Sequence, residues 1–147
     1  MTEHPPRPDP SPRALVVDDE PDIRELLGIT LGRMNIQVTA ASDYAGAVRQ
    51  LGSERFDLVL TDMRLPDGDG LDLVEWIQVH RPGLPVAVIT AHGNVEAAVR
   101  ALKLGAFDFI SKPLDLAALR KLITATLKLG ESIEATGRRA TLRLLGD

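Results

Sequence analysis

The sequence predicts a doubly wound α/β domain, in which a parallel β-sheet carries helices on both faces. Five short apolar runs alternate with segments of helical periodicity, which gives the pattern (βα)5. Several of these runs are continuous rather than alternating, as expected for strands that are covered on both sides. Right-handed crossovers between the parallel strands then distribute the helices over the two faces. A chain of 147 residues has the length of one such domain.

Local signals place the individual elements. Apolar runs predict five strands, at Ala14–Val17, Ile36–Ala40, Leu58–Thr61, Val86–Thr90 and Phe107–Ile110. Helical spacing predicts five helices, over residues 21–34, 44–51, 71–77, 94–104 and 115–129. Pro21 suits a first helical turn, and Ser42 and Asn94 are good N-terminal caps. The segment Arg81-Pro82-Gly83 is expected to end the third helix, and Gly105 the fourth.

Composition excludes several classes of protein. The chain has no cysteine, which removes disulfide frameworks, thiol catalysis and cysteine-ligated metal sites and fits a cytoplasmic location. A net charge of −4 argues against direct binding of nucleic acid. The proline-rich residues 1–12 predict a disordered arm, residues 13–129 hold the domain, and residues 130–147 are interpreted as the start of a linker to output domains outside this chain.

Polar residues stand at the carboxyl ends of four of the five predicted strands. These residues are Asp18, Asp19 and Glu20 after the first strand, Asp62 after the third, Thr90 at the end of the fourth and Lys112 after the fifth. Doubly wound sheets bind ligands outside these ends, where the strand order reverses. A strand order of 2-1-3-4-5 would bring the side chains into one pocket, and a Rossmann order is the alternative. Each residue alone is typical of a cap, a turn or a surface position, but their combination favours a site.

The residue types in this pocket point to phosphoryl transfer. The carboxylates of Asp18, Asp19 and Asp62 would repel one another unless a cation lay among them. Mg²⁺ prefers oxygen ligands and leaves room for phosphate oxygens, so it fits this set better than zinc. With Lys112 opposite, metal and ammonium would neutralise a phosphoryl group while a positioned oxygen attacks it.

Four segments resemble the receiver domain of bacterial two-component response regulators. They are Val-Val-Asp-Asp-Glu-Pro at 16–21, Leu-Thr-Asp-Met-Arg-Leu-Pro-Asp-Gly-Asp-Gly at 60–70, Val-Ile-Thr-Ala-His-Gly at 88–93 and Gly-Ala-Phe-Asp-Phe-Ile-Ser-Lys-Pro at 105–113. The resemblance covers residues 13–129 and is strongest to the receivers of NtrC-type activators, in particular to regulators of type IV pilin transcription. It implies a flavodoxin-like sheet with the strand order 2-1-3-4-5.

The resemblance also implies a role for each polar residue. Asp62 would be the phosphoacceptor, which takes a phosphoryl group from a phosphohistidine of a sensor histidine kinase. Asp18 and Asp19 would hold Mg²⁺ together with Asp62 and the backbone carbonyl of Arg64. Lys112, joined to Pro113 by a cis bond, would contact the phosphoryl group, and Thr90 would bond to it once it has formed. Phe109 takes the place of an aromatic switch residue that is often tyrosine, so its ring cannot hydrogen-bond across the output face.

The predicted function is therefore a phosphorylation-dependent switch for a transcription-regulating output domain, not a turnover enzyme. Its only chemistry would be to acquire a phosphoryl group and to lose it to water. A stand-alone receiver that acts through protein contacts is an alternative. A haloacid-dehalogenase-type phosphatase would need a second Asp where Arg64 stands. A flavodoxin-like cofactor carrier would need a loop rich in Ser, Thr and Gly in place of Asp18-Asp19-Glu20.

The fourth and fifth predicted helices each carry two apolar stripes, although a surface helix normally needs one. In the fourth helix we expect Val95, Val99 and Leu102 to cover the sheet, and Ala97, Ala101 and Leu104 to be spare. In the fifth, the expected core residues are Leu116, Leu119, Ile123 and Leu127, and the spare ones are Ala118, Leu122, Ala125 and Leu129. Alanine is also simply a good helix former. Helix propensity alone could therefore explain the alanines. If the spare stripes instead contact a partner, they predict a homodimer across a two-fold axis.

Overall fold

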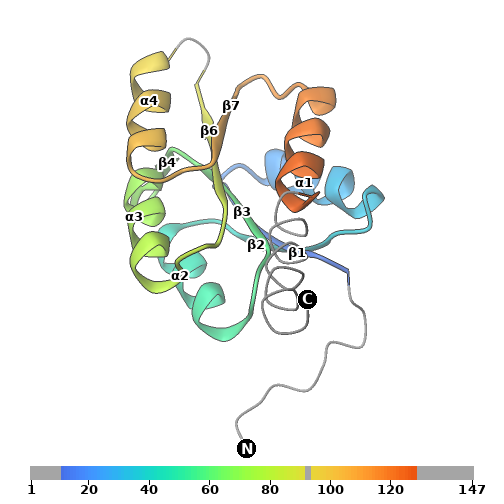
Figure 1. Ribbon diagram of the computed structural model, residues 1–147, viewed down its shortest axis with the longest axis horizontal. Coiled ribbons are helices and arrows are strands. Elements are labelled where there is room, and N and C mark those ends of the chain that lie inside the picture. Colours follow the sequence, from blue (N-terminus) through green and yellow to red (C-terminus); the bar gives the residue numbers. More distant parts are fainter. Residues whose placement is uncertain (1–10, 92–93, 129–147) are drawn as a thin grey trace, which may run out of the picture.

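A parallel β-sheet forms the centre of the molecule in a computed structural model that describes residues 11–91 and 94–128 (Figure 1). Within these residues the five parallel strands are β1 Arg13–Val17, β2 Gln37–Ala41, β3 Leu58–Asp62, β6 Val86–Thr90 and β7 Asp108–Ser111. They lie in the order β2-β1-β3-β6-β7. The predicted doubly wound sheet is confirmed, and counting only these five strands gives the predicted order 2-1-3-4-5.

Helices cover both faces of the sheet (Figure 1). They are α1 Pro21–Arg33, α2 Tyr44–Ser53, α3 Gly70–His80, α4 Val95–Lys103 and a last helix over residues 116–128. Leu15 and Val17 of β1 face α2 and α3, whereas Ala14 and Val16 face α1 and the last helix. Because alternate residues of one strand enter opposite cores, the central strands β1, β3 and β6 are mostly apolar and almost wholly buried.

The register of the sheet aligns the carboxyl ends of its strands. Val17 lies opposite Thr61, Asp62 lies opposite Ile89, and Thr90 lies opposite Ser111. The residues that follow β1, β3, β6 and β7 therefore lie along one edge of the sheet, where its strand order reverses.

A small antiparallel hairpin, absent from the predicted elements, connects β3 to α3. Its strands are β4 Arg64–Leu65 and β5 Gly68–Asp69. The sequence signal was present, because Leu65-Pro66-Asp67-Gly68 has Pro and Gly where a β-turn favours them. Asp69 then caps α3, since its carboxylate accepts a hydrogen bond from the N–H of Leu71 at 2.9 Å.

The N-terminus of α2 is capped by residues other than the predicted Ser42. Asp43 accepts a hydrogen bond from the N–H of Gly46 at 2.7 Å. Asp67 of the hairpin also reaches this helix, and its two carboxylate oxygens accept from the N–H groups of Tyr44 and Ala45 at 2.7 and 3.0 Å. A longer-range carboxylate thus does part of what the sequence assigned to a local hydroxyl. The cap predicted for α4 is confirmed, because Asn94 accepts from the N–H of Ala97.

The prediction for the two faces of α4 was wrong. Ala98 and Ala101 are the buried residues of this helix, whereas Val95, Val99 and Leu102 are 69%, 42% and 41% exposed. Small residues face the sheet because they let the helix approach it closely, which leaves the larger apolar side chains in solvent. In the last helix Leu119 and Ile123 are buried as predicted and Ala118 and Ala125 are exposed. Leu122, predicted to be spare, packs against the core instead.

Several predictions concern residues that the structure does not describe. They include the arm at 1–12 apart from Ser11 and Pro12, the linker at 130–147, and Leu129 of the spare stripe. Among the described residues, no helix combines the length and the apolar character that crossing a membrane requires.

Candidate functional site

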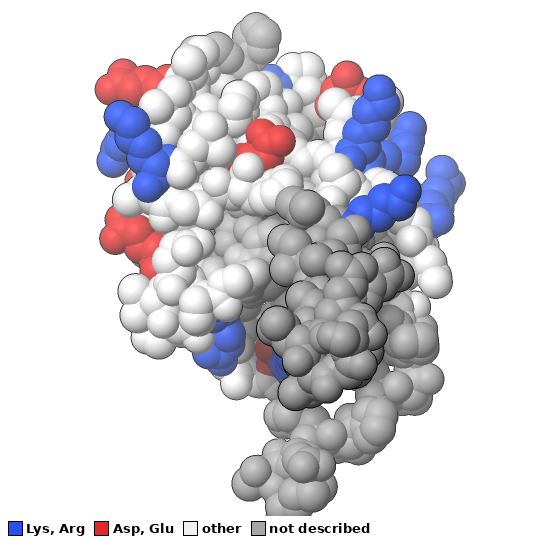
Figure 2. Space-filling view, viewed as in Figure 1, with Lys and Arg blue, Asp and Glu red and all other residues white. Residues whose placement is uncertain are grey.

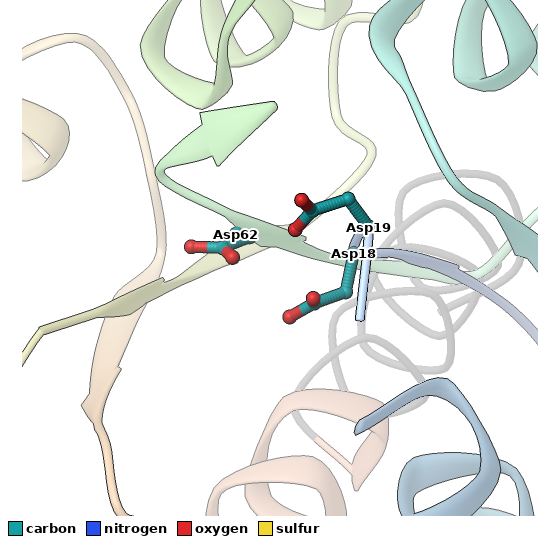
Figure 3. Close-up of side chains that lie close together, drawn as sticks. All are labelled: Asp18, Asp19 and Asp62. Atoms are coloured by element: carbon teal, nitrogen blue, oxygen red, sulfur yellow. The ribbon is translucent and has the colours of Figure 1, made fainter. Parts of the chain in front are cut away.

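Three carboxylates meet at the carboxyl edge of the sheet (Figure 3). Asp62 is the last residue of β3, and Asp18 and Asp19 directly follow β1. One oxygen atom from each carboxylate lies within 4.8 Å of the other two. Asp18 is fully buried, Asp62 is 9% exposed and Asp19 is exposed. The group is therefore closed toward the core and open toward solvent on the side of Asp19.

The main chain and one carboxylate oxygen of Asp18 are held by hydrogen bonds. Its N–H donates to the carbonyl of Ala41 at 3.1 Å, and its carbonyl accepts from Nη1 of Arg24 at 2.8 Å. Its Oδ1 accepts from the N–H of Glu20 at 2.9 Å. The other oxygen, Oδ2, is buried and has no hydrogen-bond partner. A buried carboxylate oxygen without a hydrogen bond is costly and marks a place where a cation can bind.

Burial raises the pKa of Asp18, because desolvation disfavours its charged form. The hydrogen bond from the N–H of Glu20 acts in the opposite direction, the charge of Asp62 raises this pKa further, and Lys112 lowers it. The folded protein without metal therefore holds this carboxylate in an unfavourable environment.

The Lys112 ammonium faces the carboxylates. Its Nζ donates to Oδ2 of Asp62 at 3.1 Å and lies 3.7 Å from Oδ2 of Asp18 and 3.8 Å from Oε2 of Glu20. Partial burial lowers the pKa of Lys112, but the hydrogen bond to Asp62 and the charges of Asp62, Asp18 and Glu20 outweigh this effect and raise it. Its peptide bond to Pro113 is cis, as the sequence resemblance implied.

Thr90 lies at the end of β6 and Phe109 lies within β7, and neither makes a hydrogen bond or ion pair with the carboxylates among the interactions found in the structure. Thr90 ends β6 and is buried, and its hydroxyl donates to the carbonyl of Ile110 at 3.5 Å, a long hydrogen bond. Phe109 lies on β7 with 38% of its surface exposed. The four residues brought together are therefore Asp18, Asp19, Asp62 and Lys112, with Thr90 at the adjacent strand end.

Three further residues shape the site, and of these the sequence places only Glu20 at a strand end, without giving it a role. Glu20 adds a fourth carboxylate near Lys112. Arg24 binds the Asp18 carbonyl. Gly70 donates its N–H to the Met63 carbonyl at 2.8 Å, and a side chain at this position would overlap the Asp62 carbonyl. Gly70 also gave a local signal, because Gly-Asp-Gly stands at the start of a helix and after the candidate site loop.

The donor set fits a hard divalent cation. It offers three carboxylates, one of them with an unpartnered buried oxygen, and no nitrogen or sulfur ligand among the described residues of the cluster. The N–H of Arg64 donates to Oδ1 of Asp62 at 3.4 Å, which places the start of β4 beside the same carboxylate.

The five-stranded fold and this acidic edge define the receiver domain of response regulators, and the chain belongs to that family. The sequence model described as the response regulator receiver domain matches residues 14–124. The chain is 55% identical over 135 residues to the response regulator protein PilR of Pseudomonas aeruginosa, a match that covers 92% of this chain and 30% of PilR. These matches confirm the family predicted from the four motifs and the likeness to regulators of the PilR kind.

Two more relatives extend the comparison. The transcriptional regulatory protein GlrR of Escherichia coli is 40% identical over 125 residues, which covers 85% of this chain and 28% of GlrR. The solution structure of the beryllofluoride-activated NtrC4 receiver domain dimer has 33% identity and a TM-score of 0.75 and covers 79% of this chain and 96% of that chain. The chain thus spans less than a third of the length of PilR and GlrR. Response regulator receiver domains are in general not classical enzymes.

Proposed function

We propose that this chain is a phosphorylation-activated receiver that accepts a phosphoryl group on Asp62 from a sensor histidine kinase in the cytoplasm. Through this change it would switch a transcription-regulating output domain that lies outside the chain. The observation that carries the proposal is the position of Asp62, whose carboxylate lies 3.1 Å from the Lys112 ammonium within a cluster of carboxylates. The similarity to the response regulator protein PilR and to the transcriptional regulatory protein GlrR supports an output of this kind.

Asp18, Asp19, Asp62 and the backbone carbonyl of Arg64 would hold Mg²⁺. When bound, the ion supplies positive charge for the phosphoryl oxygens and offsets the repulsion among the carboxylates. Asp19 is the exposed member of the set and so stands where a hydrated ion would enter. Asp18 presents its unpartnered Oδ2 from the buried side.

The chemical step uses Asp62 as nucleophile. A carboxylate oxygen of Asp62 attacks the phosphorus of the phosphohistidine, a P–O bond forms, and the P–N bond to the imidazole breaks. Lys112 already contacts Asp62 and would follow the developing charge onto a phosphoryl oxygen. Attack by water on the acyl phosphate later releases inorganic phosphate and restores the Asp62 carboxylate.

Through Thr90, phosphorylation would shift the population of the domain from one conformation to another. Its hydroxyl now makes only a 3.5 Å bond to the Ile110 carbonyl, so little is lost when it turns to a phosphoryl oxygen. A contact that exists only in the phosphorylated arrangement stabilises that arrangement relative to the other. Thr90 leads into the segment before α4, and the half-exposed ring of Phe109 would move inward as Thr90 shifts.

Phosphorylation would favour a homodimer that forms through the side of the molecule carrying α4 and β7. Five of the large exposed apolar residues lie there, namely Val95, Val99, Leu102, Phe107 and Phe109, and we call them the α4–β7 patch. The face over β7, between α4 and the last helix, is mostly uncharged, with an acidic group near its middle and Lys and Arg on both flanks (Figure 2). The NtrC4 receiver, which has the same fold, is described as a dimer in its activated form. The alanine stripe of α4 that was predicted as the dimer surface is therefore replaced in this proposal by the α4–β7 patch.

Mass spectrometry of the metal-loaded protein after incubation with a small phosphodonor tests the site. We expect one labile phosphoryl group in the wild type and none in Asp62→Asn. Equal labelling of both proteins would show that the phosphoacceptor is a residue other than Asp62.

Sedimentation with and without a phosphoryl mimic tests the dimer. Val99→Glu and Leu102→Glu should prevent the association that the mimic induces in the wild type. Val79→Glu on α3, which replaces an apolar residue that is 74% exposed away from the patch, is the matched control and should associate normally. Unchanged association of the α4 variants, or loss of it in the control, would remove the patch as the interface.

A further inference from the structure

Arg24 ties the first turn of α1 to the loop that carries two of the candidate metal ligands. Its Nη1 donates to the backbone carbonyl of Asp18 at 2.8 Å. Its own N–H donates to the carbonyl of Glu20 at 3.1 Å. The N–H bond is the ordinary first hydrogen bond of the helix, so the guanidinium bond to Asp18 is the contact that the arginine side chain adds.

The guanidinium contact matters because no side chain caps the N-terminus of α1. Glu20 stands at the N-cap position, but its side chain makes no capping hydrogen bond. The conformation of the loop therefore depends on the bond from Glu20 to Oδ1 of Asp18 and on the Arg24 guanidinium. With these bonds and the one to Ala41 in place, the only polar atom of Asp18 left without a hydrogen-bond partner is Oδ2, which lies among the carboxylates.

We propose that Arg24 is a positioning residue for Mg²⁺, a role that rests on the proposed function. Its guanidinium fixes the main chain at Asp18 so that the carboxylates of Asp18 and Asp19 converge with Asp62 before the ion arrives. Groups that orient metal ligands without touching the metal typically change metal affinity by about 10–100-fold when they are removed.

Positioning and charge act in opposite directions, which makes the role testable. Arg24 is a cation close to a site for another cation, so a purely electrostatic role would weaken Mg²⁺ binding, and its removal would tighten the binding. A positioning role predicts the reverse, because a loop that has lost its anchor must be ordered by the ion itself. The direction of the change therefore decides between the two.

The experiment measures the dissociation constant of Mg²⁺ by titration calorimetry on the full chain, together with the melting temperature of the metal-free protein. Arg24→Met removes the donor and the charge, and we expect Mg²⁺ to bind about 10-fold more weakly. Arg24→Lys keeps the charge but not the planar, forked donor, and we expect an intermediate loss. Arg33→Met, at the exposed last turn of the same helix, removes one charge away from the loop and should change the affinity less than 2-fold, consistent with screening by salt.

Each result has a defined meaning. If the Arg24 variants melt at lower temperature but bind Mg²⁺ as the wild type does, Arg24 only supports the fold and the inference fails. Equal or tighter binding in Arg24→Met also refutes it. Should Arg24→Met not fold, Arg24→Lys decides by the same criterion. A wild type that binds no Mg²⁺ would instead refute the metal site of the proposed function, and the positioning role with it.

Discussion

Gly70 packs its Cα against the backbone carbonyl of Asp62, so closely that a side chain of any size would overlap that oxygen. A Cβ at position 70 would also lie 2.9 Å from the Cα of Met63. The N–H of Gly70 donates to the carbonyl of Met63 at 2.8 Å, and Thr61 donates its hydroxyl to the Asp62 carbonyl at 3.0 Å. The position of the candidate phosphoacceptor therefore depends on the first residue of α3.

Gly70→Ala should displace the Asp62 loop. We expect a loss of about 1–3 kcal/mol in the free energy of unfolding, as for other overpacked sites, and slower labelling of Asp62 by a small phosphodonor. Gly28→Ala in the middle of α1 is the control, because a Cβ there would meet nothing within 4 Å. It should stabilise the protein by about 0.5–1 kcal/mol and leave labelling unchanged. Urea denaturation and mass spectrometry measure the two quantities, and a Gly70→Ala protein as stable as the wild type would contradict the prediction.

Asp18→Asn should stabilise the metal-free protein at neutral pH. Because burial raises the pKa of Asp18, the folded state binds this proton more tightly than the unfolded chain does. The stability from this group is therefore present at low pH and lost as the pH rises through the folded pKa. Asparagine carries no charge there and can still accept the hydrogen bond from Glu20.

Thermal melting in the presence of a chelator and of Mg²⁺ checks this prediction. Without metal, Asp18→Asn should melt above the wild type at pH 7. With Mg²⁺ the wild type should gain more than the variant, since binding to the folded state alone stabilises it. A metal-free variant that melts below the wild type would show that the carboxylate is not strained.

Lys112→Met should separate metal binding from phosphorylation. Removal of the ammonium takes away the cation that forms ion pairs with the carboxylates of Asp62, Asp18 and Glu20, so the site becomes more negative. We expect Mg²⁺ to bind more tightly, by roughly 3- to 10-fold, since unit charges at this range interact by about 1 kcal/mol or more. Labelling of Asp62 should fall sharply, because the phosphoryl oxygens lose their protein counter-charge. Weaker metal binding in calorimetry would mean that Lys112 organises the ligands rather than competing with the ion.

Asp67→Asn should remove an acid-sensitive contribution to stability. The hydrogen bonds from the N–H groups of Ala45 and Tyr44 lower the pKa of Asp67 below its usual 3.8. A lowered pKa means that the stabilisation is present above the unfolded value and is lost as the pH falls through the folded one. The difference in unfolding free energy between wild type and variant should therefore be constant from pH 7 to about pH 5 and shrink below pH 4. A difference that does not depend on pH in urea titrations would assign the effect to geometry alone.

The sequence predicted the sheet because strands that are buried on both faces appear as short continuous apolar runs. Each strand of the sheet appears as an apolar run, and the polar residues after β1, β3, β6 and β7 identified one edge. Asp18, Asp19, Asp62 and Lys112 could be assembled in this way because strand order alone decides which strand ends are neighbours.

Long-range contacts are what the sequence could not supply. Nothing local distinguishes Asp43 from Ser42 as the cap of α2, and nothing shows that Asp67 will reach the same helix. The faces of α4 were predicted wrongly because hydrophobicity ranks Val99 above Ala101, whereas the space between helix and sheet admits the smaller side chain. The role proposed for Arg24 rests on a contact over only six residues, which the helical spacing of α1 does not reveal because the partner is a backbone carbonyl outside the helix.

The strand order also determines when the site comes into existence during folding. β1 pairs with β2 on one side and with β3 on the other. The second edge of β1 is therefore covered only when β3, which ends at Asp62, has paired with it. Parallel pairing across such separations makes folding slow relative to proteins with local contacts. Asp18 and Asp62 meet only after that step, and Lys112 arrives only when β7 has added to β6. A chain in which β7 has not yet joined the sheet would thus hold the carboxylates without their ammonium, so the cluster of Asp18, Asp62 and Lys112 is complete only when the sheet is complete.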